Sequence, residues 1–109
     1  MTSESRRMPR RAVTGTVDVI DSMSGHRIGQ LGNLSLGGML LMASTPLAED
    51  ALYQLRFALP DSAGDAIEVG AHVLWCDAAS APGQFWAGIR FLGLEPETTG
   101  RLRAWSQAS

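Results

Sequence analysis

Apolar and polar residues alternate with a period of two over three stretches of the chain, which is the pattern of half-buried β-strands. These stretches are 51–59, 67–75 and 85–91. The positions expected to face inward are Ala51, Tyr53, Leu55, Phe57 and Leu59 in the first stretch, Ile67, Val69, Ala71, Val73 and Trp75 in the second, and Phe85, Ala87, Ile89 and Phe91 in the third.

Three further strands are expected in the first half of the chain. Val13, Val17 and Val19 share one face of a strand over residues 12–20. A second strand runs over 26–34, where the alternation slips near Gly29 and Gly32 and indicates a bulge. The third is the short apolar run at 39–42.

The final stretch changes to a helical period. Leu94, Leu102 and Trp105 share one helical face, and Pro96 suits a first helical turn. Six sequential antiparallel strands joined by short loops favour closure, because an open sheet leaves exposed edges. We therefore expect an all-β fold, a six-stranded antiparallel barrel with a short C-terminal helix; the alternative is a two-sheet sandwich.

The chain has 109 residues, of which 45% are hydrophobic, and this fits one domain with a modest core. We place that domain at 12–109. Residues 1–11 lack hydrophobic period, and we expect them to form a flexible basic arm.

Charge is unevenly distributed between the two parts. The arm holds four arginines and one glutamate, whereas the rest holds five arginines and ten acidic residues. An acidic body with a small cationic arm is a poor general binder of nucleic acid polymers, because duplex affinity needs many phosphate contacts. It suits one small anion better, although DNA binding through the arm is a further hypothesis to test.

Several other classes are disfavoured. No apolar run is long enough to insert into a membrane, and the N-terminus lacks the apolar region of a signal peptide. A single cysteine, Cys76, fits a reducing cytoplasm. Two histidines and one cysteine, scattered, do not predict a metal site, and Ser35 does not lie in a nucleophile elbow. We expect no catalysis and no cofactor.

The segment Asn33-Leu34-Ser35-Leu36-Gly37-Gly38 lies between two apolar runs and carries candidate binding groups. Gly37 and Gly38 allow a ligand to approach the backbone, because no Cβ intervenes. Asn33 and Ser35 add short hydrogen-bonding groups. By itself, the segment is equally explained as a bulge or a tight turn.

The arm supplies the second candidate segment, Arg6-Arg7-Met8-Pro9-Arg10-Arg11. It contains two arginine pairs spaced by four, Arg6/Arg10 and Arg7/Arg11. With Asn33-x-Ser35-x-x-Gly38, these residues resemble the ligand signature of the PilZ domain family, an Arg-x-x-x-Arg segment before the first strand and an Asp/Asn-x-Ser-x-x-Gly segment at the second. His72-Val73-Leu74-Trp75 and Ala87-Gly88-Ile89-Arg90-Phe91 also resemble the family's last two strands.

The resemblance implies a six-stranded barrel with a following helix and a bacterial receptor for cyclic di-GMP. It implies a ligand site at Arg6, Arg7, Arg11, Asn33, Ser35, Gly37 and Gly38. We prefer the Arg7/Arg11 pair because Arg11 leads directly into the strand. Asn33 stands where many members have Asp.

The chemistry agrees with the resemblance, because arginine can fork onto phosphate or guanine and can stack on a base. The leading hypothesis is a cytoplasmic receptor whose arm becomes ordered on cyclic di-GMP, which changes the surface shown to an unidentified effector protein. The alternative is a PilZ-like protein interaction module that binds no nucleotide.

Overall fold

The computed structural model describes residues 10–59 and 64–107. Residues 1–9, and with them Arg6 and Arg7, lie outside the described part. The elements are β1 (Arg11–Ala12), β2 (Asp18–Asp21), β3 (Arg27–Leu34), β4 (Gly38–Ala43), β5 (Leu52–Phe57), β6 (Ile67–Ala78), β7 (Phe85–Leu92) and α1 (Pro96–Gln107).

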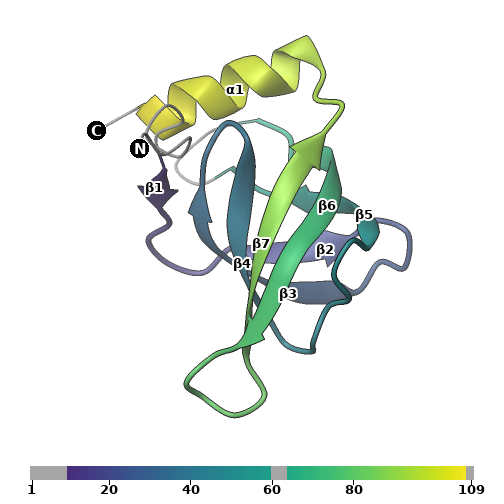
Figure 1. The fold of residues 1–109 in the computed structure, drawn as a ribbon. Coiled ribbons are helices and arrows are strands. Elements are labelled where there is room, and N and C mark those ends of the chain that lie inside the picture. The colour runs from purple at the N-terminus through teal and green to yellow at the C-terminus, as the bar shows by residue number, and fades with distance from the viewer. Residues whose placement is uncertain (1–9, 60–63, 108–109) are drawn as a thin grey trace, which may run out of the picture.

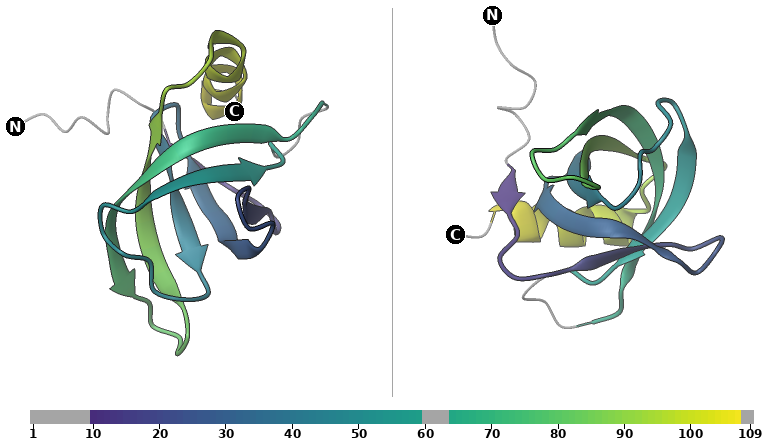
Figure 2. Two further views of the ribbon diagram at one scale, coloured as in Figure 1. Left: turned by 90° about the vertical axis from the view of Figure 1, so that its right-hand side faces the viewer. Right: turned by 90° about the horizontal axis from the view of Figure 1, so that it is seen from below.

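Six strands form one closed antiparallel sheet, in the circular order β3-β2-β5-β6-β7-β4 (Figures 1 and 2). The pairing of β3 with β4 closes the circle. β1 is an additional strand at the end of β3, and α1 lies across one end of the barrel (Figure 1). The predicted barrel with a C-terminal helix is confirmed, and a two-sheet sandwich is excluded.

The order of the strands differs from a simple succession of hairpins. β4 pairs with β3 and β7, whereas β5 pairs with β2 and β6. The connection at 44–51 therefore joins strands that are not neighbours. Strand period cannot reveal this, because it reports which face is buried and not which strand lies alongside.

The expected strand over 12–20 is divided into β1 and β2, which pair with successive parts of the same edge of β3. Gly15 interrupts it with φ of +79°, a backbone conformation that favours glycine. Val13 N–H still donates to the Gly32 carbonyl at 3.0 Å, and Leu31 N–H donates to Val17 at 2.9 Å. The expected slip in the following strand is also present, as register shifts between Leu31 and Asn33 and opposite Val19 and Ile20.

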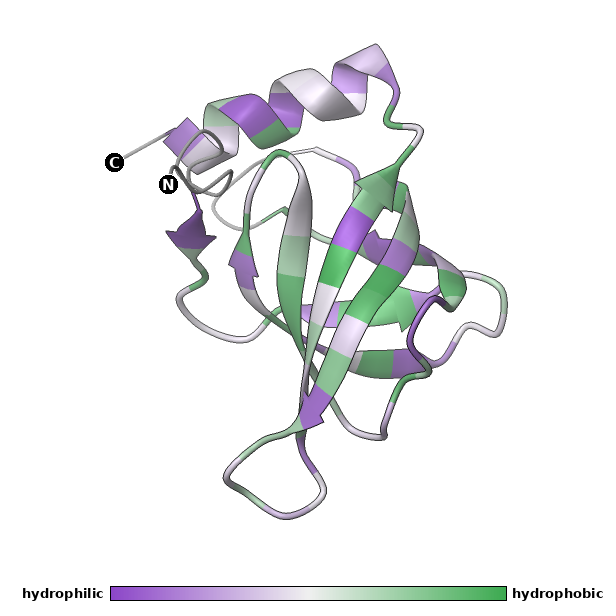
Figure 3. Ribbon diagram, in the orientation of Figure 1, coloured by the Kyte–Doolittle hydropathy of each residue, from purple (hydrophilic) through white to green (hydrophobic). Residues whose placement is uncertain are grey.

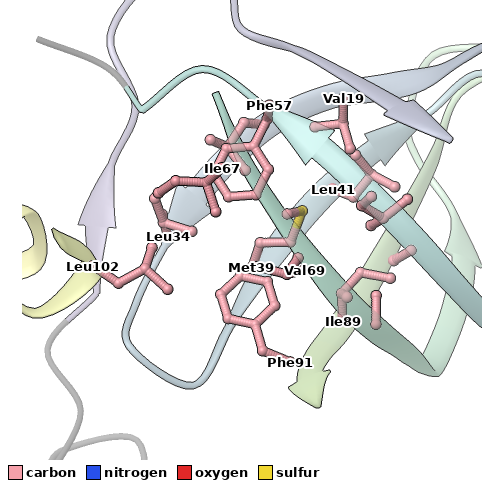
Figure 4. Packing of buried hydrophobic residues seen from close by; sticks show 14 of the residues in the cluster. Val19, Leu34, Met39, Leu41, Phe57, Ile67, Val69, Ile89, Phe91 and Leu102 are labelled. Carbon is pink, nitrogen blue, oxygen red and sulfur yellow. The ribbon is translucent and has the colours of Figure 1, made fainter. Parts of the chain in front are cut away.

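The core fills the barrel with the alternate residues that the strand pattern predicts. Figure 3 shows the hydropathy alternating along β6 and β7. Phe57 and Phe91 stack with ring centroids 6.4 Å apart. Leu102 and Trp105 are buried and close the end under α1, and Figure 4 shows Leu102 directed toward Leu34. Burial of each such large side chain contributes about 1.5–3 kcal/mol to the free energy of unfolding. The core therefore stabilises the strands that carry the residues of the outer face.

Trp75 departs from the predicted pattern. Val73 pairs with Ile89 but Trp75 pairs with Gly88, so Leu74 is an extra residue in β6. Such a bulge shifts the alternation by one position. Trp75 therefore lies on the outer face of the barrel, 39% exposed, instead of in the core. Its new position supplies one wall of the groove described below.

The one helix among the described residues, α1, is too short to cross a bilayer.

Candidate functional site

A groove crosses four strands on the outer face of the barrel. Strand register places Trp75 of β6, Gly88 of β7, Leu40 of β4 and Asn33 of β3 in one row. We call the hollow along this row the outer-face groove. It has a volume of about 210 Å³, and it is lined by Arg10, Asn33, Met39, Leu40, Leu74, Trp75, Gly88 and Ile89.

One end of the groove is aromatic because Gly88 makes room for an indole. A Cβ at Gly88 would collide with Nε1 and the ring carbons of Trp75. The indole therefore lies against bare backbone and remains partly exposed. With Leu40 beside it, this end offers a flat apolar surface on which a planar ring can stack.

The other end is polar and carries positive charge. Arg10 Nη1 donates a hydrogen bond to Asn33 Oδ1 at 2.9 Å. A guanidinium has five N–H donors, and this contact uses one of them. Arg10 is exposed, so its other donors face the solvent where an anionic group could approach.

The rest of the predicted motif forms the tight turn between β3 and β4. Ser35 N–H donates to the Gly38 carbonyl at 2.9 Å, and the Ser35 hydroxyl accepts from Gly37 N–H at 3.3 Å. The hydroxyl also lies 3.3 Å from the Gly38 carbonyl, and Ser35 is only 1% exposed. A Cβ at Gly38 would collide with the carbonyl of Ile89. In this structure, Ser35 and Gly38 thus hold the hairpin that presents Asn33.

Arg11 points away from the groove and contacts α1. Its Nη1 donates to the Trp105 carbonyl at 2.9 Å, and its guanidinium carbon lies 4.4 Å from the centroid of the Trp105 ring. Arg10 directly precedes β1, and the two adjacent side chains go to different partners. Arg10 goes to Asn33 and Arg11 goes to the helix.

The structure therefore brings one arm arginine to Asn33, and that residue is Arg10. Arg6 and Arg7 are not described, and the assignment of Arg6, Arg7, Arg11, Asn33, Ser35, Gly37 and Gly38 to a ligand stays a prediction. Asn33 is the one groove-lining residue that belongs to the predicted set, and Arg10 and Trp75 are the polar and aromatic lining residues that this set lacks. Arg10 belongs to the Arg6/Arg10 pair, the alternative to the preferred Arg7/Arg11 pair, and the adjacent apolar residues Leu74 and Trp75 were the available sign of a bulge.

Two larger hollows lie elsewhere, where α1 meets β6. Their volumes are about 480 and 350 Å³, and both are lined by Glu68 and Thr98. The first also contains Glu97 and Arg101. Neither hollow contains a residue of the predicted site. In the described part of the chain, no three histidine, cysteine or carboxylate side chains gather as metal ligands would.

A closed barrel with a helix at one end and a cationic, aromatic groove outside it defines a small β-barrel domain with a candidate ligand groove. The family model of the PilZ domain matches residues 4–108, and the chain belongs to that family.

Solved structures agree with this fold. The Bacillus subtilis inhibitor of motility, MotI or DgrA, is similar with a TM-score of 0.75 and 15% identity, over 97% of this chain and 50% of that protein. The PilZ domain of Escherichia coli YcgR with c-di-GMP gives 0.69 and 17%, over 91% and 86%. YcgR in complex with c-di-GMP, also from E. coli, gives 0.69 and 19%, over 89% and 42%. The chain thus spans about half of MotI. No curated protein matches it.

Proposed function

We propose that this domain is a receptor for cyclic di-GMP without catalysis of its own, which passes the binding event to a partner protein. Membership of the PilZ family supports the proposal, as do the two YcgR structures that hold c-di-GMP. The observation that carries it is the bond from Arg10 to Asn33 at the edge of the outer-face groove. This contact joins the arginine segment and the Asn-x-Ser-x-x-Gly segment at one place.

The groove matches the parts of the ligand. Cyclic di-GMP offers two phosphates and two guanines. The indole of Trp75 suits a guanine face, and the Asn33 amide suits the hydrogen-bonding edge of a base. Arginines of the arm suit the phosphates or the O6 and N7 atoms of guanine.

Ligand binding would also compete for Arg11. In the structure, this side chain is engaged with the carbonyl and the ring of Trp105. To contact a nucleotide in the groove, it must leave the last turns of α1. Binding would then fix the arm beside β3 and loosen the end of the helix, so the surface offered to a partner changes at both places.

Isothermal titration calorimetry with cyclic di-GMP tests the proposal. The wild type is expected to bind, and Arg7→Ala, Arg10→Ala and Asn33→Ala are each expected to weaken binding. Arg103→Ala is the matched control, because Arg103 is an exposed arginine on α1 away from the groove. No heat with the wild type, or unchanged affinity in all three groove variants, would overturn the proposal.

The ordering step has its own test. Hydrogen exchange of residues 4–12 should slow on addition of cyclic di-GMP, while exchange in the core of β6 stays unchanged. Equal exchange of the arm with and without bound ligand would contradict the ordering step and leave the binding proposal intact.

A second candidate is a protein interaction module that needs no nucleotide. Leu52 and Leu74 favour it, because they are 69% and 47% exposed on the outer face. Exposed apolar side chains of this size are common at protein contacts. Capture of the same partner with and without cyclic di-GMP, with no binding of the nucleotide, would favour this candidate over the receptor.

A further inference from the structure

A second row of residues lies beside the outer-face groove, and of its members only Gly38 belongs to the predicted site. Leu52 pairs with His72, His72 pairs with Arg90, and Arg90 pairs with Gly38. This row is adjacent to the groove because Arg90 follows Gly88 by two residues, about 7 Å along β7. His72 and Arg90 therefore face outward on the same side of the barrel as Trp75.

Three side chains in this region form a chain of contacts. His72 Nε2 lies 3.0 Å from Asp50 Oδ1, and Arg90 Nη2 lies 3.5 Å from His72 Nδ1. The tautomer with hydrogen on Nε2 satisfies both contacts, because Nε2 then donates to Asp50 and Nδ1 accepts from Arg90. Asp50 thus selects the tautomer that leaves Nδ1 free to hold the arginine.

Asp50 is itself held in place by the backbone. Its φ is +67°, the left-handed region that aspartate tolerates better than most residues. Its N–H donates to the Val73 carbonyl at 2.8 Å, which anchors it beside β6. The carboxylate is therefore positioned for His72 by the connection between β4 and β5.

The side chain that contacts Arg90 decides whether the positive charge of its guanidinium is cancelled. Among residues 10–59 and 64–107, Arg27 forms an ion pair with Asp18 and Asp50 contacts His72, but no carboxylate lies within ion-pair distance of Arg90. A neutral imidazole can orient a guanidinium without cancelling its charge, whereas a carboxylate would do both. On the other side, Gly38 has no side chain that could cover Arg90.

We propose that Arg90 is a further ligand-binding residue, which takes a phosphate of the nucleotide at the rim of the outer-face groove, and that His72 is its positioning residue. This inference rests on the proposed function and names an additional contact for the same ligand. The planar guanidinium supplies two parallel N–H donors to a phosphate, and its position beside His72 reduces the ordering needed on binding.

The test is a titration of cyclic di-GMP into the wild type and a set of variants. Arg90→Ala is expected to weaken binding about tenfold or more, as loss of a charge-assisted contact does. Arg90→Lys should lie between the two, because a point charge remains without the fork. Arg56→Ala is the matched control, since it removes an exposed arginine from the outer face of β5.

Two substitutions at His72 separate positioning from general stability. His72→Asn keeps an oxygen near the place of Nδ1, which can still accept from Arg90, and should retain affinity within about threefold. His72→Gln keeps only an N–H near the place of Nε2, which can still donate to Asp50, and its affinity should fall nearly as far as that of Arg90→Ala. In the Arg90→Ala background, His72→Gln should add no further loss. Thermal unfolding of each variant verifies that it is folded.

The outcomes are distinct. If the wild type binds and Arg90→Ala binds equally well, or loses no more than Arg56→Ala, the role of Arg90 is overturned while the proposed function stands. Equal affinities for His72→Asn and His72→Gln would overturn the positioning role. Absence of binding by the wild type would overturn the proposed function and this inference together.

Discussion

At the scale of single residues, the glycines of the groove and of its hairpin have different neighbours, and these decide what a methyl group would do. A Cβ at Gly38 would meet the backbone carbonyl of Ile89, which cannot move without disturbing the pairing of β4 with β7. A Cβ at Gly88 would meet the side chain of Trp75, which can rotate away. A side chain at Gly38 would therefore disturb the fold, whereas a side chain at Gly88 would displace the indole that forms one wall of the groove.

Gly38→Ala is therefore expected to lower the free energy of unfolding by about 1–3 kcal/mol, as overpacking against backbone does. Urea denaturation followed by circular dichroism measures this change. A variant as stable as the wild type would show that Gly38 is not required by the close approach of β7.

Gly88→Ala should leave a folded barrel but displace the indole of Trp75. We expect weaker binding of cyclic di-GMP and a shifted tryptophan emission maximum, with a smaller loss of stability than Gly38→Ala. Unchanged emission together with unchanged affinity would contradict the placement of Trp75 over Gly88.

At the scale of elements, α1 is connected to the sheet partly through one side chain from β1. The contacts of Arg11 with the Trp105 carbonyl and ring join the two ends of the described chain. Buried Leu102 adds the apolar part of this contact. The stability of the helix and the position of the arm should therefore depend on each other.

Arg11→Ala is expected to lower the free energy of unfolding by about 1–2 kcal/mol, from the loss of a charge-assisted hydrogen bond and a cation–π contact. Exchange of the last amides of α1 should become faster. Arg103→Ala serves as the comparison for an arginine on the same helix, and equal behaviour of the two variants would refute the connection.

A substitution at Gly100 in α1 is expected to stabilise the domain, in contrast to Arg11→Ala. It is exposed, and a Cβ there would meet nothing within 4 Å. Gly100→Ala should raise the free energy of unfolding by about 1 kcal/mol, because alanine is the better helix former. A decrease in thermal midpoint would contradict this expectation.

The elements also show what the sequence could reveal. Period-two alternation identified β5, β7 and the first part of β6, because each has one face in the core. The division of 12–20 at Gly15, and the extra residue at Leu74, depend on register with neighbouring strands, which no single stretch encodes. The Asn33 segment was located as a candidate site from its residues. Which arginine meets it was open, because Arg10 and Arg11 are adjacent and face opposite sides.

At the scale of the whole molecule, a closed barrel leaves few ways to transmit a signal through the core. The sheet closes through six strands, and its interior is filled by buried apolar side chains. Changes on binding should therefore be confined to the outer face, the arm and the end of α1. The barrel acts as a fixed frame on which these parts rearrange.

A ligand that binds only the folded domain should stabilise it by mass action. At a free concentration 100 times the dissociation constant, cyclic di-GMP should add about 2.7 kcal/mol, a rise of several degrees in the thermal midpoint. The mononucleotide GMP at the same concentration is the control. No shift under conditions that saturate binding in calorimetry would mean that the unfolded chain binds the nucleotide equally well.

The extra residue in β6 has a wider consequence for how this surface could arise or disappear. If Leu74 were deleted, Trp75 would directly follow inward-facing Val73 and would still lie outside, opposite Gly88, so only one exposed leucine would be lost. An added residue in β7 that paired with Leu74 would instead make the register regular and turn the indole toward the interior. The stacking capacity of this surface can therefore be lost by insertion of one codon in the neighbouring strand, while the codon for the tryptophan itself stays unchanged.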